Sequence, residues 1–169
     1  MFRLFTGERL RCASVALVLL ASAATQTACQ RGKDASFIGT FRMGERVQAG
    51  PLIYTVLEAE WKPQLDGGRT PANRFLFIRV SITNSGGSQV SVPAFVLQAP
   101  DGKTYEEVTE GLGEVRGWLN ILRTIAPAQT EQGYVIFDAP VGAYKLVMSD
   151  AGEIGQEKYA HVEIPVHLE

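Results

Sequence analysis

The sequence predicts an all-β domain with the architecture of an antiparallel β-sandwich. Three observations predict this class: many short segments alternate apolar and polar residues, turns rich in Gly and Pro separate them, and no long segment has a helical period. The chain has 169 residues, 46% of them hydrophobic and 20% charged, which is the composition of one globular domain.

The N-terminus has the features of an export signal. Arg3, Arg9 and Arg11 precede an uninterrupted apolar run over residues 13–24. A helix of that length spans about 18 Å, which is short of the roughly 30 Å hydrocarbon core of a bilayer. An export signal is therefore favoured over a transmembrane helix.

A cysteine just beyond the apolar run leaves two alternatives for processing. Ala21, Ser22 and Ala23 supply the small residues of a plain secretory cleavage site, which would leave Cys29 as a lone thiol. The residues TQTAC instead resemble the lipobox of bacterial lipoproteins, in which the cysteine receives a lipid and becomes the first mature residue. We favour lipid attachment at Cys29, because an unpaired exported thiol would otherwise need its own explanation.

Lipidation would divide the chain into three parts. Residues 1–28 would be the signal peptide, residues 29–41 the lipidated N-terminus and a polar tether without regular structure, and residues 42–169 the sandwich. Gln30 stands where lipoproteins kept in the inner membrane usually have aspartate, so the resemblance favours the outer membrane and a periplasmic domain. Secretion is the alternative.

The clearest alternation covers residues 74–84, and an earlier strand lies between Gly50 and Pro63. The core face of the later strand is predicted to hold Leu76, Ile78, Val80 and Ile82, and that of the earlier strand Leu52, Tyr54 and Val56. Phe75 and Phe77 point away from the stripe, where they would cover a second layer or contact a partner.

Further strands are expected at residues 89–99, 103–108, 132–138, 143–149 and 159–168. Pro93 places the first of them at a sheet edge or bulge, and the sequence PDG makes a tight hairpin into the second. The last carries an apolar stripe formed by Ala160, Val162, Ile164, Val166 and Leu168.

Residues 111–127 fit two patterns. Val115, Trp118, Leu119 and Leu122 have helical spacing, whereas Leu119, Ile121 and Ile125 alternate as in a strand. Because glycines open the segment, we favour a loop over residues 109–117 and a strand over residues 118–125.

Five segments in order, GERVQAGPLIYTV, FIRVSITNSGGSQVSV, FVLQAPDGKTY, IAPAQTEQGYVIFDAP and YKLVMSD, resemble a bacterial family. It is the immunoglobulin-like domain of unknown function found in lipoproteins and secreted proteins, related in fold to secreted immunoprotective antigens. The resemblance implies an immunoglobulin-like antiparallel β-sandwich and supplies no catalytic residues. Ala128 stands where the family usually has the Gly of a Pro-Gly pair, which predicts a different turn.

Residues with the chemistry for catalysis or metal binding are few. His161 and Glu163 would lie about 7 Å apart on one strand face, and His167 about 20 Å from His161 is too distant to join them. We therefore expect no metal site, no cofactor and, because no nucleophile has a nearby base, no enzyme. The acidic residues Glu106, Glu107, Glu110 and Glu114 are expected to form a solvated turn.

The best candidate contact is an apolar patch beside the Gly-rich loop. Trp118, Leu119 and Ile121 would contact a partner, the alternative being that Trp118 packs into the core. We expect a non-catalytic envelope lipoprotein that acts as a protein-binding or assembly module, the alternative being a periplasmic small-molecule or metal-binding carrier. The expected partners are the membrane and an envelope protein; nucleic acid is not expected, because the charges, net −2, form no basic patch.

Overall fold

The computed structural model describes residues 36–65, 70–112, 115–152 and 155–166, which form eleven strands and no helix. The strands are β1 (Ser36–Arg42), β2 (Arg46–Ala49), β3 (Leu52–Lys62), β4 (Arg74–Asn84), β5 (Val90–Ser91), β6 (Val96–Gln98), β7 (Thr104–Glu106), β8 (Thr124–Ile125), β9 (Thr130–Ala139), β10 (Tyr144–Ser149) and β11 (Lys158–Ile164). Cys29, Gln30, Glu114, His167 and Leu168 lie outside the described residues, and no described helix could cross a membrane.

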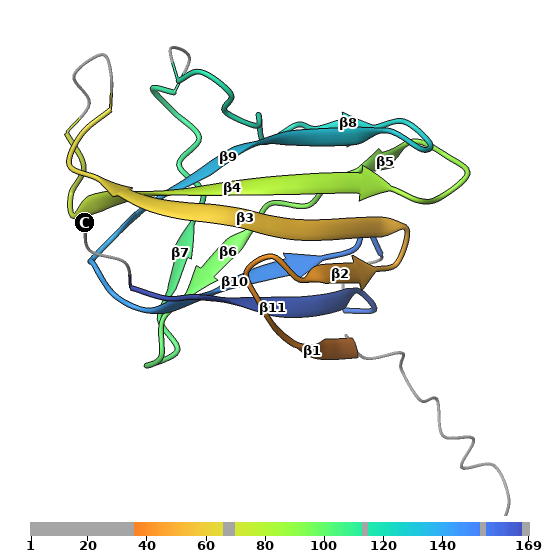
Figure 1. The fold of residues 1–169 in the computed structure, drawn as a ribbon, viewed down its shortest axis with the longest axis horizontal. Helices are drawn as coiled ribbons and strands as arrows, with labels where there is room; N and C mark the ends of the chain where they lie inside the picture. The colour runs from red at the N-terminus through yellow and green to blue at the C-terminus, as the bar shows by residue number, and fades with distance from the viewer. Residues whose placement is uncertain (1–35, 66–69, 113–114, 153–154, 167–169) are drawn as a thin grey trace, which may run out of the picture. The chain divides into compact units, whose positions relative to one another are not determined.

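The strands form a β-sandwich, as predicted (Figure 1). One sheet has five strands in the order β1-β11-β10-β6-β7, the other has four in the order β2-β3-β4-β9, and β5 pairs with β8 as a short ribbon. All pairs are antiparallel except β1 with β11, which is parallel. The first described strand therefore lies beside the last.

The space between the two sheets is filled by the alternating residues of the sequence. Leu76, Ile78, Val80 and Ile82 of β4 are fully buried, as expected, and so are Leu52, Tyr54 and Val56 of β3. Ala160, Val162 and Ile164 of β11 close the core from the facing sheet. Each buried aliphatic side chain of this kind stabilises the fold by about 1.5–3 kcal/mol relative to an exposed one.

A second apolar cluster lies on the other face of the four-stranded sheet. Phe75 and Phe77 point there from β4 and are 0% and 4% exposed. Of the two predicted roles, covering a second layer or contacting a partner, the structure confirms the first. The connection between β7 and β8 covers them with side chains that include Val108, Leu112 and Trp118. The four-stranded sheet is thus covered on both faces at this end.

Four predictions of secondary structure are wrong in part. Residues 36–41, expected in an irregular tether, belong to β1, which pairs with β11 along one edge only. The single strand expected over residues 89–99 is two strands, β5 and β6, which belong to different sheets. Within residues 118–125 only β8 is a strand, and Trp118 makes a single parallel bridge to Tyr134 of β9. β11 ends at Ile164 because Pro165 follows, so Val166 is 42% exposed and leaves the predicted stripe.

The turn at residues 126–129 places Ala128 in the left-handed backbone conformation. Ala128 has φ 59° and follows Pro127, and the amide of Gln129 donates a hydrogen bond to the carbonyl of Ala126 over 3.2 Å. These are features of a type II turn, in which the third residue is usually Gly. The expectation of a different turn is wrong, because the chain keeps the conformation that Gly favours and strains an alanine to do so.

Asn84, at the end of β4, holds this turn in place. Its main-chain carbonyl accepts the amide of Ala128 over 2.9 Å, and its buried side chain donates to the carbonyls of Ser88 and Ile125 over 2.7 and 2.9 Å. The surrounding hydrogen bonds therefore compensate for the strain at Ala128.

Ala128→Gly should raise the free energy of unfolding by roughly 0.5–1 kcal/mol. A left-handed L-residue costs about 1–2 kcal/mol, part of which is offset by the greater entropy of glycine in the unfolded chain. Urea denaturation measures the difference. Ala151→Gly, at an exposed position without positive φ, is the control and should not stabilise; equal effects of the two substitutions would contradict the assignment.

Candidate functional site

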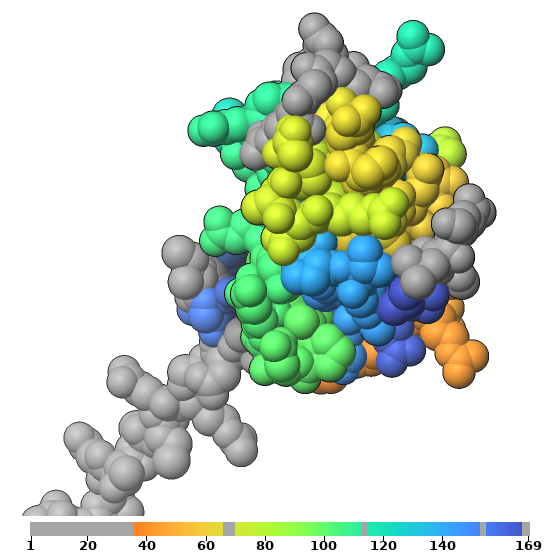
Figure 2. All heavy atoms as spheres, turned by 90° about the vertical axis from the view of Figure 1, so that its left-hand side faces the viewer, coloured from red at the N-terminus to blue at the C-terminus, as the bar shows by residue number. Residues whose placement is uncertain are grey.

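A groove of about 770 Å³ lies at one end of the five-stranded sheet. Four neighbouring strands meet there: β1, β6 and β11 end at the groove, and β10 begins beside it. The hairpin between β6 and β7 contributes Pro100 and Gly102 to the lining of the groove. Figure 2 shows this end of the domain, where green atoms of that hairpin lie beside blue atoms around the start of β10. This volume is within the range of about 300–1,000 Å³ that small-molecule sites occupy.

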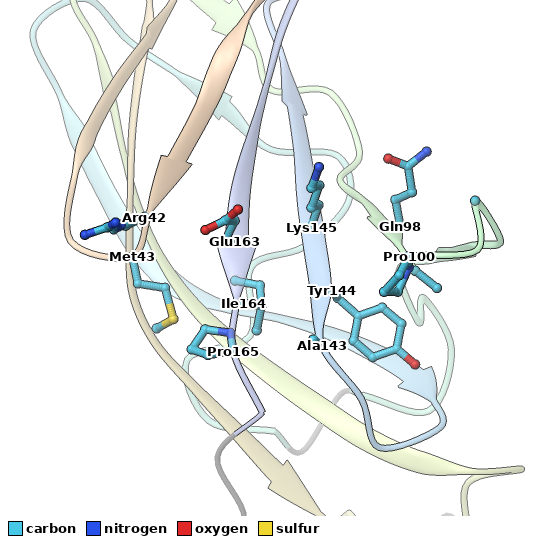
Figure 3. A pocket seen from close by; sticks show the side chains of 12 residues that line it. Arg42, Met43, Gln98, Pro100, Ala143, Tyr144, Lys145, Glu163, Ile164 and Pro165 are labelled. Atoms are coloured by element: carbon cyan, nitrogen blue, oxygen red, sulfur yellow. The ribbon is translucent and has the colours of Figure 1, made fainter.

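Charged side chains from neighbouring strands cross the groove in one row (Figure 3). In the strand register Arg42 of β1 pairs with Glu163 of β11, Glu163 with Lys145 of β10, and Lys145 with Gln98 of β6. The order across the sheet is therefore cation, anion, cation and amide. None of the three charged groups forms an ion pair with another described residue, so their charges remain available to a ligand.

The rest of the groove is largely apolar. Met43, Ile164 and Pro165 lie below the charged row, together with the ring of Tyr144 (Figure 3). The hydroxyl of Tyr144 donates a hydrogen bond to the carbonyl of Pro140 over 2.6 Å. Burial, reinforced by the neighbouring Tyr105, raises the pKa of Tyr144 to about 12, so this hydroxyl stays protonated at neutral pH.

The sequence does not point to this site, because its parts come from four separate segments. Arg42, Lys145 and Glu163 are ordinary surface charges until the register brings them together. The sequence suggests Glu163 only as a metal ligand beside His161. Both do share a face, but among the described residues no group of three or more His, Cys, Asp or Glu could hold a metal ion.

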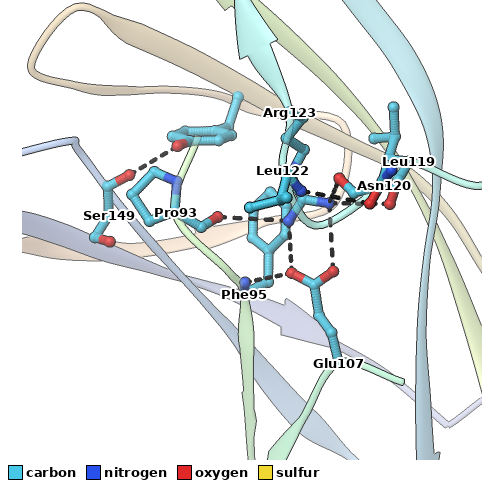
Figure 4. Close-up of polar contacts among 9 residues, drawn as sticks. Pro93, Phe95, Glu107, Leu119, Asn120, Leu122, Arg123 and Ser149 are labelled. Carbon is cyan, nitrogen blue, oxygen red and sulfur yellow. Dashed lines mark hydrogen bonds and ion pairs between the residues drawn. The ribbon is translucent and has the colours of Figure 1, made fainter. Parts of the chain in front are cut away.

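A buried ion pair lies apart from the groove (Figure 4). Arg123 and Glu107 have side chains only 2% exposed, and Nη2 of Arg123 lies 2.6 Å from Oε1 of Glu107. Nη1 donates to the second carboxylate oxygen over 3.3 Å, which makes the pair bidentate. The expectation of a solvated turn is thus wrong for Glu107, although Glu106 and Glu110 are exposed.

The remaining polar atoms of this pair are largely satisfied by the main chain. Arg123 donates to the carbonyls of Leu119, Asn120 and Pro93 over 3.3–3.4 Å. The amide of Phe95 donates to Glu107, and the guanidinium lies 4.8 Å above the Phe95 ring. These partners belong to the β5–β6 and β7–β8 connections of the chain. The pair therefore holds these two loops together and does not present a charge to a substrate.

The predicted contact residues separate in the structure. Leu119 is 8% exposed and packs in the main core, so its prediction as a contact is wrong. Trp118 is half-buried against the second apolar cluster, and Ile121 is also half-buried. The fully exposed apolar side chain of this loop is Leu122, at 86%.

Gly133 of β9 explains how closely this loop packs. A Cβ at Gly133 would lie 2.4 Å from the carbonyl oxygen of Gly117 and 2.8 Å from Cγ of Leu119. The carbonyl of Gly117 accepts the amide of Tyr134 over 2.8 Å, which holds the loop on the sheet. Only glycine permits this approach.

The fold defines a small β-sandwich domain of the immunoglobulin-like class, with a groove at one end of its five-stranded sheet. More particularly, the chain belongs to the family described as Domain of unknown function (DUF4352), which matches residues 41–159. This confirms the resemblance noted in the sequence. No match is found among curated proteins.

Solved structures confirm the fold. The yjhA protein from Bacillus subtilis aligns with a TM-score of 0.56 at 19% identity, over 72% of this chain and 98% of its own. The secreted protein MPT63 from Mycobacterium tuberculosis aligns with a TM-score of 0.53 at 14% identity, over 72% and 95%. A "putative lipoprotein (ycdA)" from Bacillus subtilis aligns with a TM-score of 0.56 at 12% identity, over 72% and 38%.

Arg123→Met should lower the free energy of unfolding by roughly 3–5 kcal/mol, because it leaves the Glu107 carboxylate buried without its partner. The double variant Glu107→Leu/Arg123→Met should recover much of this loss, since no charge is then buried. Urea denaturation measures both.

The matched control is Arg79→Met, which breaks an ion pair of 3.7 Å whose side chains are 41% and 49% exposed. It should cost less than about 1 kcal/mol. If Arg123→Met lowered the free energy of unfolding no more than this control does, the buried pair would not be the interaction that holds the loops on the sandwich.

Proposed function

We propose that this chain is a non-catalytic binding module of the bacterial cell envelope, anchored through a lipid on Cys29. The domain faces the periplasm, and Gln30 after the cysteine favours the outer membrane over the inner one. The export signal and the cysteine support the location, and the groove supports the binding role. The single histidine of the described residues, His161, contacts aromatic rings and not a nucleophile.

The observation that carries the binding role is the unpaired charged row above an apolar floor. Arg42 and Lys145 can receive a carboxylate, Glu163 between them can receive an ammonium group, and Met43 with Ile164 can cover an apolar body. A ligand that matches the cations, the anion and the apolar floor together is a small amphiphilic zwitterion. Free amino acids and the ends of short peptides have this chemistry.

A dipeptide should bind the groove through both of its charges. In isothermal titration calorimetry we expect leucyl-leucine to bind and N-acetyl-leucine amide, which carries neither charge, to give no heat. Lys145→Gln and Glu163→Gln should each weaken binding by roughly 10- to 100-fold, since a hydrogen bond to a charged group contributes about 1.5–3 kcal/mol.

The control variant is Lys158→Gln, an exposed lysine of β11 outside the groove, which should leave the affinity unchanged. Absence of heat with leucyl-leucine, or an equal loss in all three variants, would count against the groove as the ligand site.

Protein binding is a second candidate, because Leu122 is 86% exposed beside the half-buried Ile121. Exposed apolar anchors of this kind are common at protein interfaces. Trp118, expected to be the anchor, contributes only the part of its ring left open by the second cluster.

Leu122→Ser should abolish crosslinking to an envelope protein if this loop is an interface. The measurement is in-cell crosslinking of the full-length chain followed by mass spectrometry. Val141→Ser, at an apolar position 40% exposed on another loop, is the control and should keep the crosslink. A crosslink retained in both variants would place the interface elsewhere.

A further inference from the structure

An exposed aromatic patch lies at the point where the described chain begins. The patch consists of Phe37 of β1 with Tyr159 and His161 of β11. Ile38 follows Phe37 at an irregularity in the strand pairing. Phe37 is 48% and Ile38 40% exposed. Six large apolar side chains are exposed among the described residues, and these are the only two adjacent in sequence.

The three rings of the patch support one another. The ring of Phe37 lies 5.3 Å from that of Tyr159 and 4.9 Å from that of His161, and Tyr159 lies 5.8 Å from His161. Burial, and secondarily the nearby Lys145, lowers the pKa of His161, so the ring is uncharged at neutral pH. The result is a surface of three adjoining rings, of which Tyr159 and His161 carry polar atoms.

Such a surface has the chemistry of a membrane interface. Aromatic side chains with a polar atom concentrate at the level of the lipid headgroups, where one end of the ring is apolar and the other wet.

The length of the tether limits how far the patch can lie from the bilayer surface. Seven peptide units separate Cys29 from Ser36, so even a fully extended chain spans only about 25 Å. A lipid on Cys29 holds that residue at the bilayer surface, which keeps Phe37 within a short distance of the headgroups. At this range a second weak contact benefits from a high effective concentration.

We propose that the patch of Phe37, Tyr159 and His161 rests on the membrane that holds the lipid anchor. The inference depends on the lipidated Cys29 of the proposed function. It goes beyond that proposal because it makes the folded domain itself a membrane contact and orients it. The groove, at the opposite end of β1, then opens about 17 Å further along the strand.

The test uses full-length protein, purified in detergent and reconstituted into vesicles of phosphatidylethanolamine and phosphatidylglycerol with brominated acyl chains. Phe37→Trp places a fluorophore in the patch, and Leu57→Trp places one at a similarly exposed site, 40%, on β3 of the other sheet. The fluorescence of Trp61 and Trp118 is subtracted with the unsubstituted chain.

We expect brominated lipid to quench at least about half of the signal of the tryptophan at position 37 and little of that at position 57. Equal quenching at the two positions, or quenching at neither, would overturn the inference, and a protein covering the patch would give the latter result.

The intact mass of the same preparation separates this failure from failure of the anchor. A chain without the mass of a lipid on Cys29 would overturn the anchor and this inference together. A lipidated chain whose residue 37 is not quenched would overturn the membrane contact alone and leave the proposed binding module standing.

Discussion

The buried ion pair between Arg123 and Glu107 is the interaction on which the closed form of this sandwich depends. Glu107 extends β7 and bridges Phe137 of β9, so it joins the five-stranded sheet to the four-stranded one. The carbonyl of Arg123 accepts the amide of Val92, which continues the β5–β8 ribbon. One charged contact therefore connects elements of all three sheets.

Alternation predicted the long strands that carry a stripe of buried side chains facing the main core. β4 and β9 are of this kind, and their limits follow from the sequence almost to the residue. β1 was missed because its side chains stay largely exposed, so burial left no apolar stripe to recognise. The 107–123 connection was misjudged because Arg123 and Glu107 lie in segments without a period.

The candidate site was beyond sequence reasoning for a related reason. Its charges become neighbours through the register of strands whose order in the sheet does not follow the order in the chain. Gly133 and Ala128 show the opposite case, in which one residue reports a local constraint. The first allows a loop to approach the sheet, and the second occupies a left-handed turn that the neighbouring hydrogen bonds enforce.

The parallel pairing of β1 with β11 has a consequence for the order of folding. Ser36 pairs with Lys158 and Arg42 with Glu163, so the edge of the five-stranded sheet joins the two ends of the described chain. Long-range pairings of this kind form late, because closing a long loop costs entropy before any contact compensates for it. A nascent chain can form the antiparallel strand pairs first, but β1 has no partner until β11 has been synthesised. Until then, the edge of β1 remains open to pairing with other strands.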